Sequence, residues 1–288
     1  MGIEQRSGRA GTARFALESW AEVGAVRGRV FVSWGLLAFF SSFAASALPV
    51  SCFIVHAEPT GVDEEAFQSL VDLVALADQH RVPLTLLLTA QWAEFVLEDA
   101  ARVTALESFL ARGHEIGAHH HAYWGTLDRA AVWDGYTDAP LDSLHAEDRA
   151  QFRGTMDDFW SLLTALPGAR ETGCFGLSEA DATDWICDLA YSTYGHTLSD
   201  AVSAPTPITI GSCTVTQVGH GLLTDVGALA MLYDSTGEES LFAVVTHVSD
   251  YAERPGVVER WFGLLASRDP EGARRDTVAR AVRAWTDQ

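Results

Sequence analysis

The sequence contains no lysine and is poor in positive charge. Its 19 basic residues are all arginine and stand against 39 acidic residues, which gives a formal net charge of −20 over 288 residues. Such a surface repels phosphate backbones and anionic lipid headgroups, so the composition argues against nucleic-acid partners and against membrane-surface binding. The acidity would also suit a neutral or cationic ligand, but a simpler explanation, an adaptation for solubility or salt, is favoured.

Several motifs that identify common enzyme classes are also missing. The chain has no GxGxxG, GxxxxGK[ST] or GxSxG pattern, which removes the main support for nucleotide binding and for serine-hydrolase chemistry. The four cysteines, Cys52, Cys174, Cys187 and Cys213, include no Cys-x-x-Cys pair. A cysteine zinc site and a thioredoxin-type site are therefore disfavoured, and three disulfide pairings stay open.

An uncharged apolar segment, residues 30–47, lies near the N-terminus and ends in Ala45-Ser46-Ala47. This pattern predicts a secretory signal peptide that is cleaved after Ala47 and a protein that is exported (secreted, periplasmic or cell-surface). An uncleaved membrane anchor through residues 30–47 and a buried helix are the alternatives. The 29 residues before this segment are long for a signal peptide, which suggests a translation start near Val26.

The remaining chain, residues 48–288, is predicted to be one domain of alternating strands and helices. Continuous apolar runs predict buried strands at 50–55, 82–89 and 240–247, and further strands are predicted at 114–119, 169–175, 191–193 and around a turn within 206–218. Helical spacing separates them at 61–80, up to 112, at 144–166, at 256–267 and at 272–285. Buried strands that alternate with helices imply parallel pairing, and about seven such units fit a (β/α) barrel.

Three of the predicted strands end in side chains that bind metals or carry protons. His119 and His121 share one face because strand side chains alternate, and His56 and Glu58 share a face for the same reason. In a parallel barrel the carboxyl ends of the strands gather at one mouth. Glu58, His119 and His121, with His56 as a further candidate, are therefore predicted to hold a divalent metal. His247, near Asp250, is the predicted catalytic acid.

Residues 122–143 form a long predicted loop with many aromatic side chains beside this mouth. Long structured loops next to a site are usually functional. Trp133, Asp134 and Tyr136 are predicted to stack on and hydrogen-bond to a sugar, with anchoring of the loop as the alternative. Tyr123 joins this predicted substrate-binding set.

Three stretches resemble the polysaccharide deacetylase (NodB-homology) superfamily. Residues 82–88 are similar to the second strand of that family, 113–119 to its histidine motif, and 244–247 to its last-strand histidine. The resemblance implies a distorted (β/α)7 barrel of the polysaccharide deacetylase type. It also implies a divalent metal, usually zinc, and hydrolysis of an N-acetyl or related acyl group by a metal-bound water.

The chain departs from the family pattern at identifiable positions. Glu58 stands where the resemblance implies a metal-binding aspartate, and Ala57 stands where it implies the general base. Tyr123 occupies the place of the second metal histidine, and His121 takes that role in a His-x-His arrangement. Arg170 corresponds to the arginine motif of the family and is grouped with the substrate-binding residues.

The prediction is a metal-dependent hydrolase that removes an acyl group from a carbohydrate or a small amide, with no nucleic-acid or nucleotide partner. Two alternatives remain. His56 in place of a carboxylate changes the charge of the site, which permits a different metal-dependent hydrolysis on the same scaffold. A barrel that lacks the catalytic general base is also compatible with a glycan-binding protein that has no enzymatic activity.

Overall fold

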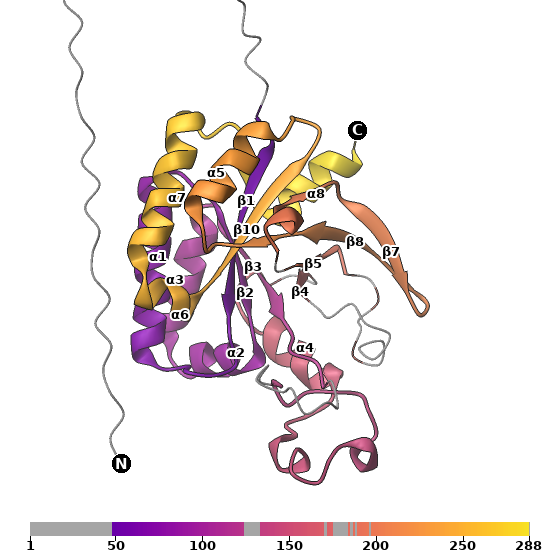
Figure 1. The fold of residues 1–288 in the computed structure, drawn as a ribbon. Coiled ribbons are helices and arrows are strands. Elements are labelled where there is room, and N and C mark those ends of the chain that lie inside the picture. The colour runs from indigo at the N-terminus through magenta and orange to yellow at the C-terminus, as the bar shows by residue number, and fades with distance from the viewer. Residues whose placement is uncertain are drawn as a thin grey trace, which may run out of the picture. The chain divides into compact units, whose positions relative to one another are not determined.

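The fold is a ring of parallel strands that is covered by helices (Figure 1). The computed structural model describes residues 48–123, 133–169, 172–174, 184, 187, 189–195 and 197–287. These residues all belong to the unit Ala44–Gln288, and the predicted signal segment at 30–47 lies outside them. Among the described residues no helix is long and apolar enough to cross a membrane.

The ring contains seven parallel strand positions that follow one another in chain order. The pairing runs β10–β1–β2–β3–β4–β5–β8, and each of these neighbours is parallel. The strands are β1 (Val50–Ala57), β2 (Leu84–Leu88), β3 (Glu115–His119), β4 (Thr172–Cys174), β5 (Tyr191–Tyr194), β8 (Cys213–Gly219) and β10 (Leu241–His247).

A single extended segment, residues 213–222, brings the two ends of this sheet together. Its first part, β8, pairs with β5, and its last two residues, β9 (Gly221–Leu222), pair in parallel with β10. The predicted (β/α)7 barrel is confirmed in this distorted form. Short strands extend the edges: β6 (Val202–Ser203), β7 (Thr206–Ile210) and β11 (Arg275–Asp276).

Helices α1, α3, α6 and α7 gather on one side of the strands in Figure 1, and the β7–β8 hairpin extends on another. The helices are α1 (Glu64–Gln79), α2 (Ala90–Leu97), α3 (Ala100–Ala111), α4 (Met156–Thr164), α5 (Val226–Ser235), α6 (Val248–Glu253), α7 (Pro255–Arg268) and α8 (Val278–Thr286). Short 3-10 turns lie at Leu141–Ser143, Arg149–Gln151 and Leu198–Ala201.

One helix is shorter than its sequence pattern predicts. Helical spacing covers residues 144–166, but α4 begins only at Met156. Thr155 ends the preceding loop with a capping box, in which its hydroxyl accepts the Asp158 N–H while the Asp158 carboxylate accepts the Thr155 N–H. Only the last part of the predicted helix is therefore helical, because the capping box at Thr155 sets where the helix begins.

Alternation along the strands divides the core into two clusters. On β1, Phe53 and Val55 belong to the cluster that packs against the helices, whereas Cys52 and Ile54 belong to a cluster inside the ring. Leu241, Ala243 and Val245 of β10 join the inner cluster. The same alternation continues past the strand ends, so His56, Glu58 and His247 follow the inner face to the mouth.

The inner face of β3 shows how tightly the ring is packed. A Cβ atom at Gly117 would lie 2.7 Å from the Thr172 hydroxyl and 2.9 Å from Leu87, so only glycine fits there. Below it, the buried Glu115 carboxylate accepts hydrogen bonds from Tyr191 (2.8 Å) and from the Ala279 N–H (3.0 Å). This buried hydrogen-bonded group fills the ring at the amino-terminal ends of the strands, so a binding site can form only at their carboxyl-terminal ends.

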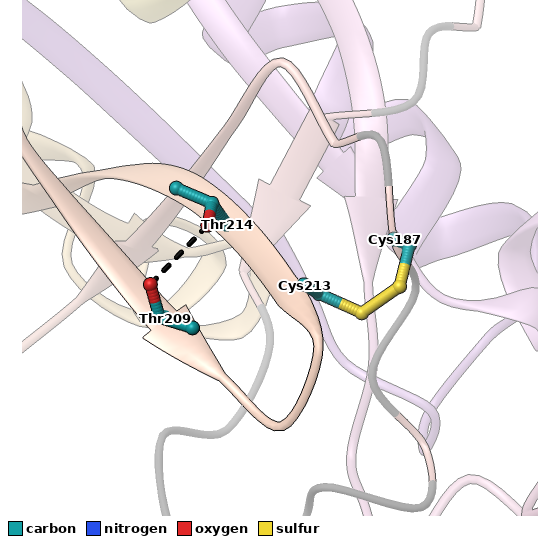
Figure 2. Close-up of a disulfide and its surroundings, with 4 residues drawn as sticks. All are labelled: Cys187, Thr209, Cys213 and Thr214. Atoms are coloured by element: carbon teal, nitrogen blue, oxygen red, sulfur yellow. Dashed lines mark hydrogen bonds between the residues drawn. A yellow bond between two sulfur atoms is a disulfide. The ribbon is translucent and has the colours of Figure 1, made fainter.

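A disulfide joins Cys187 to Cys213, the first residue of β8, and Cys52 and Cys174 are free thiols (Figure 2). The bond closes a loop over a sequence separation of 26, which restricts the unfolded chain. We expect the free energy of unfolding of the double variant Cys187→Ser/Cys213→Ser to be about 3 kcal/mol lower than that of the wild-type protein. Chemical denaturation without reductant measures this loss.

The reductant itself supplies the control for this prediction. Dithiothreitol should destabilise the wild-type protein by a similar amount and leave the double variant unchanged. Equal stability of the wild-type protein with and without reductant would contradict a stabilising disulfide.

Candidate metal centre

Three histidine side chains, from the ends of two strands, meet around the carboxylate of Glu58, which follows a third strand. Glu58 follows β1 directly, His119 ends β3 and His247 ends β10. Glu58 Oε2 lies 2.7 Å from His121 Nε2, and Oε1 lies 3.4 Å from His119 Nε2 and 3.4 Å from His247 Nε2. The strand ends therefore place these groups together, as the sequence predicts for a parallel barrel.

The protonation states suit metal binding. Burial alone would raise the pKa of Glu58, but hydrogen bonds from His119 and His121 outweigh it and hold that pKa well below its usual range. Burial, with the nearby His121, lowers the pKa of His119 to about 4. Burial and the neighbouring imidazoles also hold the pKa of His56 well below its ordinary value. At neutral pH the site therefore offers the Glu58 carboxylate and the neutral imidazoles of His56 and His119, which are the forms that bind a metal.

The donor set fits one divalent transition metal. The ligand atoms of Glu58, His119 and His121 all lie within 4.8 Å of one another. His119 Nε2 and His121 Nε2 are 2.8 Å apart, and their rings are inclined at 86°, so the in-plane lone pairs converge. His119 Nδ1 is buried and has no hydrogen-bond partner among the described residues. Two imidazoles and one carboxylate are a zinc ligand set that leaves a position for water or substrate.

The other two predicted residues flank this group. His56 stacks on His119 with ring centroids 4.0 Å apart, and His247 faces Glu58 from the other side. His247 Nδ1 lies 2.7 Å from Asp250 Oδ2, and Arg254 donates to the other Asp250 oxygen at 3.1 Å. Asp250 thus fixes the orientation of His247 and leaves its Nε2 directed at the site.

The middle histidine of the run faces the opposite way and has different partners. His120 Nδ1 lies 2.8 Å from Asp134 Oδ2, and its Nε2 lies 3.7 Å from Asp184 Oδ2. Burial alone would lower the pKa of His120, but these two carboxylates raise it to about 9. The imidazolium and its two carboxylates form a buried charged group behind the metal ligands.

Asp134 belongs to this buried group rather than to the open loop surface. Its side chain is completely buried, and Oδ2 also accepts the backbone N–H of His121 at 3.0 Å. The Asp134 N–H donates in return to the His121 carbonyl at 3.3 Å. The predicted contact of Asp134 with a sugar has no exposed atom to support it, and the bonds assign Asp134 to holding His121.

The aromatic residues predicted to bind substrate also make contacts that anchor the segment following β3. Tyr136 is 3% exposed and its hydroxyl donates to Glu94 at 3.3 Å. Trp133 donates to the Tyr136 carbonyl at 3.0 Å, and its ring meets Tyr123 edge-on at 5.1 Å. The Tyr123 hydroxyl donates to Asp148 at 2.8 Å. Trp133 and Tyr123 are partly exposed and stay predicted substrate contacts. Arg170 lies outside the described residues.

Two nearby residues were not predicted for the site. Cys174 ends β4, and its thiol lies close enough to His56 and His119 to form another group of potential metal ligands. Burial and the charge of Glu58 raise the pKa of this thiol to about 12, although a hydrogen bond with Thr193 acts in the opposite direction. The position of Cys174 at the end of a predicted strand is the same signal that identifies His119. Asp184 carries no such signal, because it lies far from His120 in the sequence and meets it only in the folded chain.

Comparison with known proteins gives a likeness in structure and none in sequence. No protein-family model and no curated protein sequence matches the chain. The structure is similar to that of a probable polysaccharide deacetylase from Pseudomonas aeruginosa PAO1, with a TM-score of 0.50 and 15% sequence identity over 83% of this chain and 91% of that one. The chain has the polysaccharide deacetylase fold.

A second similar structure is that of a putative polysaccharide deacetylase from Mycobacterium smegmatis. Its TM-score is 0.48 at 12% identity, over 88% of this chain and 94% of that one. The first of these structures confirms the fold predicted from the histidine stretch and the strand pattern.

Proposed function

We propose that this protein is a metal-dependent hydrolase that removes acetyl or related acyl groups from a carbohydrate. The observation that carries the proposal is the convergence of Glu58, His119 and His121 at the carboxyl ends of the barrel strands. The polysaccharide deacetylase fold supports a polysaccharide or oligosaccharide as the substrate. The strongly acidic chain, with its net charge of −20, favours neutral or cationic glycans over anionic ones.

Glu58, His119 and His121 would hold the metal. A zinc ion bound by such ligands lowers the pKa of a water molecule and polarises an acyl carbonyl. The negative charge of Glu58, which is 26% exposed, offsets part of the cation's charge and orients both imidazoles through its two oxygens. His119 is almost completely buried, so it forms the rigid inner wall of the site.

His247 would carry the proton. Asp250 accepts the Nδ1–H, so the lone pair of a neutral His247 lies on Nε2, which faces the site. Nε2 can take a proton during attack and return it to the leaving amine or alcohol, and Asp250 stabilises the imidazolium between these steps. This dyad would supply the proton transfer for which Ala57 has no side chain.

Release of acetate from defined substrates tests the proposal. N-acetylated and O-acetylated oligosaccharides, small amides and phosphate esters are incubated with zinc-loaded and chelator-treated protein. We expect acetate release from acetylated oligosaccharides that stops after chelation and returns when zinc is added.

Each of the other possible outcomes would support a different function for this protein. Turnover of phosphate esters alone would replace the proposal with another metal-dependent hydrolysis. Retention of glycans by zinc-loaded protein without any turnover would replace it with a glycan-binding function.

A further inference from the structure

A second group of three donors shares Glu58 with the first. The ligand atoms of His56, Glu58 and His247 also lie within 4.8 Å of one another. The group has a clear structural origin, because β1 and β10 are parallel neighbours and His56 is directly paired with His247 in their register. The two imidazoles therefore stand side by side on the inner face of the ring, with Glu58 above them at the mouth.

The orientation of the rings separates this group from the remaining candidate, His56, His119 and Cys174. A metal lies close to the plane of each imidazole that binds it, so two rings stacked face to face cannot both direct a lone pair at one ion. His56 and His119 are stacked, with an interplanar angle of only 24°. His56 and His247 are inclined at 64° with centroids 5.6 Å apart, which lets their nitrogens converge.

Two further contacts fit a ligand at this place. His56 is only 4% exposed, and its Nε2 has no hydrogen-bond partner among the described residues, which is costly for a buried polar atom. The Asp250 carboxylate holds His247 Nδ1 at 2.7 Å. A carboxylate behind a histidine, which fixes the other nitrogen toward the site, is the usual support of a metal ligand.

Glu58 can serve both groups because it has two oxygens on different sides. Oε2 lies 2.7 Å from His121, in the first group, whereas Oε1 lies 3.4 Å both from His119, in the first group, and from His247, in the second. A shared carboxylate is the common bridge between two divalent ions, which in two-metal sites lie about 3.5–4 Å apart. The second ion would bind more weakly, because it adds a like charge beside the first and shares its only anionic ligand.

We propose that His56, Glu58 and His247 form a second divalent-metal site, and that zinc bound there inhibits the enzyme by occupying His247 Nε2. The metal site stands on the geometry alone, whereas the inhibition rests on the proposed function. An ion on Nε2 removes the lone pair that would take and return the proton. The activity of the enzyme would thus rise as the first site fills and fall as the second site fills.

Zinc stoichiometry of the full chain without a histidine tag tests the site directly. Equilibrium dialysis against zinc, followed by elemental analysis, should give two ions per wild-type chain and one per chain of His56→Phe, which keeps the ring stacked on His119. His247→Gln, a second variant, should also bind one ion. His145→Gln removes an exposed histidine elsewhere and should still bind two.

Several results would overturn the second site. One ion on the wild-type chain would do so, as would two ions on both folded variants, with folding checked by circular dichroism. Loss of the second ion in Cys174→Ser would assign it to the stacked group instead.

Activity gives a separate readout that distinguishes this proposal from the proposed function. Excess zinc should lower the acetate release of the wild-type protein by at least about 10-fold, as expected when a proton-transfer group that contributes about 10²–10⁴-fold is blocked. If no substrate is turned over, the proposed function fails while the stoichiometry still decides the second site. If turnover occurs but excess zinc leaves it unchanged, the inhibition fails and the proposed function stands.

Discussion

Replacement of Glu58 by glutamine is expected to abolish tight metal binding and nearly all hydrolysis. Glu58 is the only anionic ligand in the group with His119 and His121, and its two oxygens lie 3.4 and 2.7 Å from their Nε2 atoms. We expect zinc affinity to fall by at least ~10³-fold, more than the roughly 10–100-fold cost of losing an outer partner of a ligand. Isothermal titration with zinc measures the affinity, and acetate release measures the activity.

The matched control is Glu65→Gln, which removes the same charge from an exposed position in the first turn of α1. It should leave both zinc affinity and turnover unchanged. Glu58→Gln nearly preserves the shape of the side chain, so the fold should persist. A folded Glu58→Gln protein that binds zinc as tightly as the wild-type protein would rule out Glu58 as a ligand and with it the proposed centre.

The sequence predicts this centre because two simple rules act at the same place. Side chains alternate along a strand, and parallel strands end at one edge, so polar residues that follow apolar runs must converge. Glu58, His119 and His247 obey both rules, and the structure places His119 and His247 each 3.4 Å from the Glu58 carboxylate. The same rules would have identified Cys174, which ends β4. Local sequence therefore carries most of the information about the inner face of the ring.

The support behind the centre could not be predicted in this way. His120 meets Asp134 and Asp184, which lie at unrelated separations from it along the sequence, and no periodicity relates those positions. The closure of the ring also depends on a change of partner within one segment, residues 213–222, which pairs with β5 and then with β10. Such features depend on long-range contacts rather than on local pattern, so the pattern of a single sequence does not reveal them.

Replacing Asp134 with alanine tests whether the buried charged group of His120, Asp134 and Asp184 contributes to stability and to metal binding. Asp134 Oδ2 lies 2.8 Å from His120 Nδ1 and accepts the His121 N–H at 3.0 Å, so its loss removes the nearer of the two carboxylates beside the buried His120 and the acceptor of the His121 N–H. Removing one partner of a buried ion pair costs about 3–5 kcal/mol. Because His121 also loses its anchor, we expect zinc affinity to fall by about 10–100-fold. Chemical denaturation and zinc titration measure the two effects.

Asp134→Asn separates the two roles of this carboxylate. An amide oxygen can still accept the His121 N–H but carries no charge for His120, so zinc affinity should recover more than stability does. Asp142→Ala, in the exposed turn Leu141–Ser143, removes a carboxylate from the same connecting segment and should change neither quantity. If Asp134→Ala is as stable as Asp142→Ala and binds zinc normally, the buried group behind the metal ligands does not position them. A loss of zinc affinity in Asp134→Ala that is restored in Asp134→Asn would instead show that the anchor of His121, rather than the charge beside His120, sets the geometry of the centre.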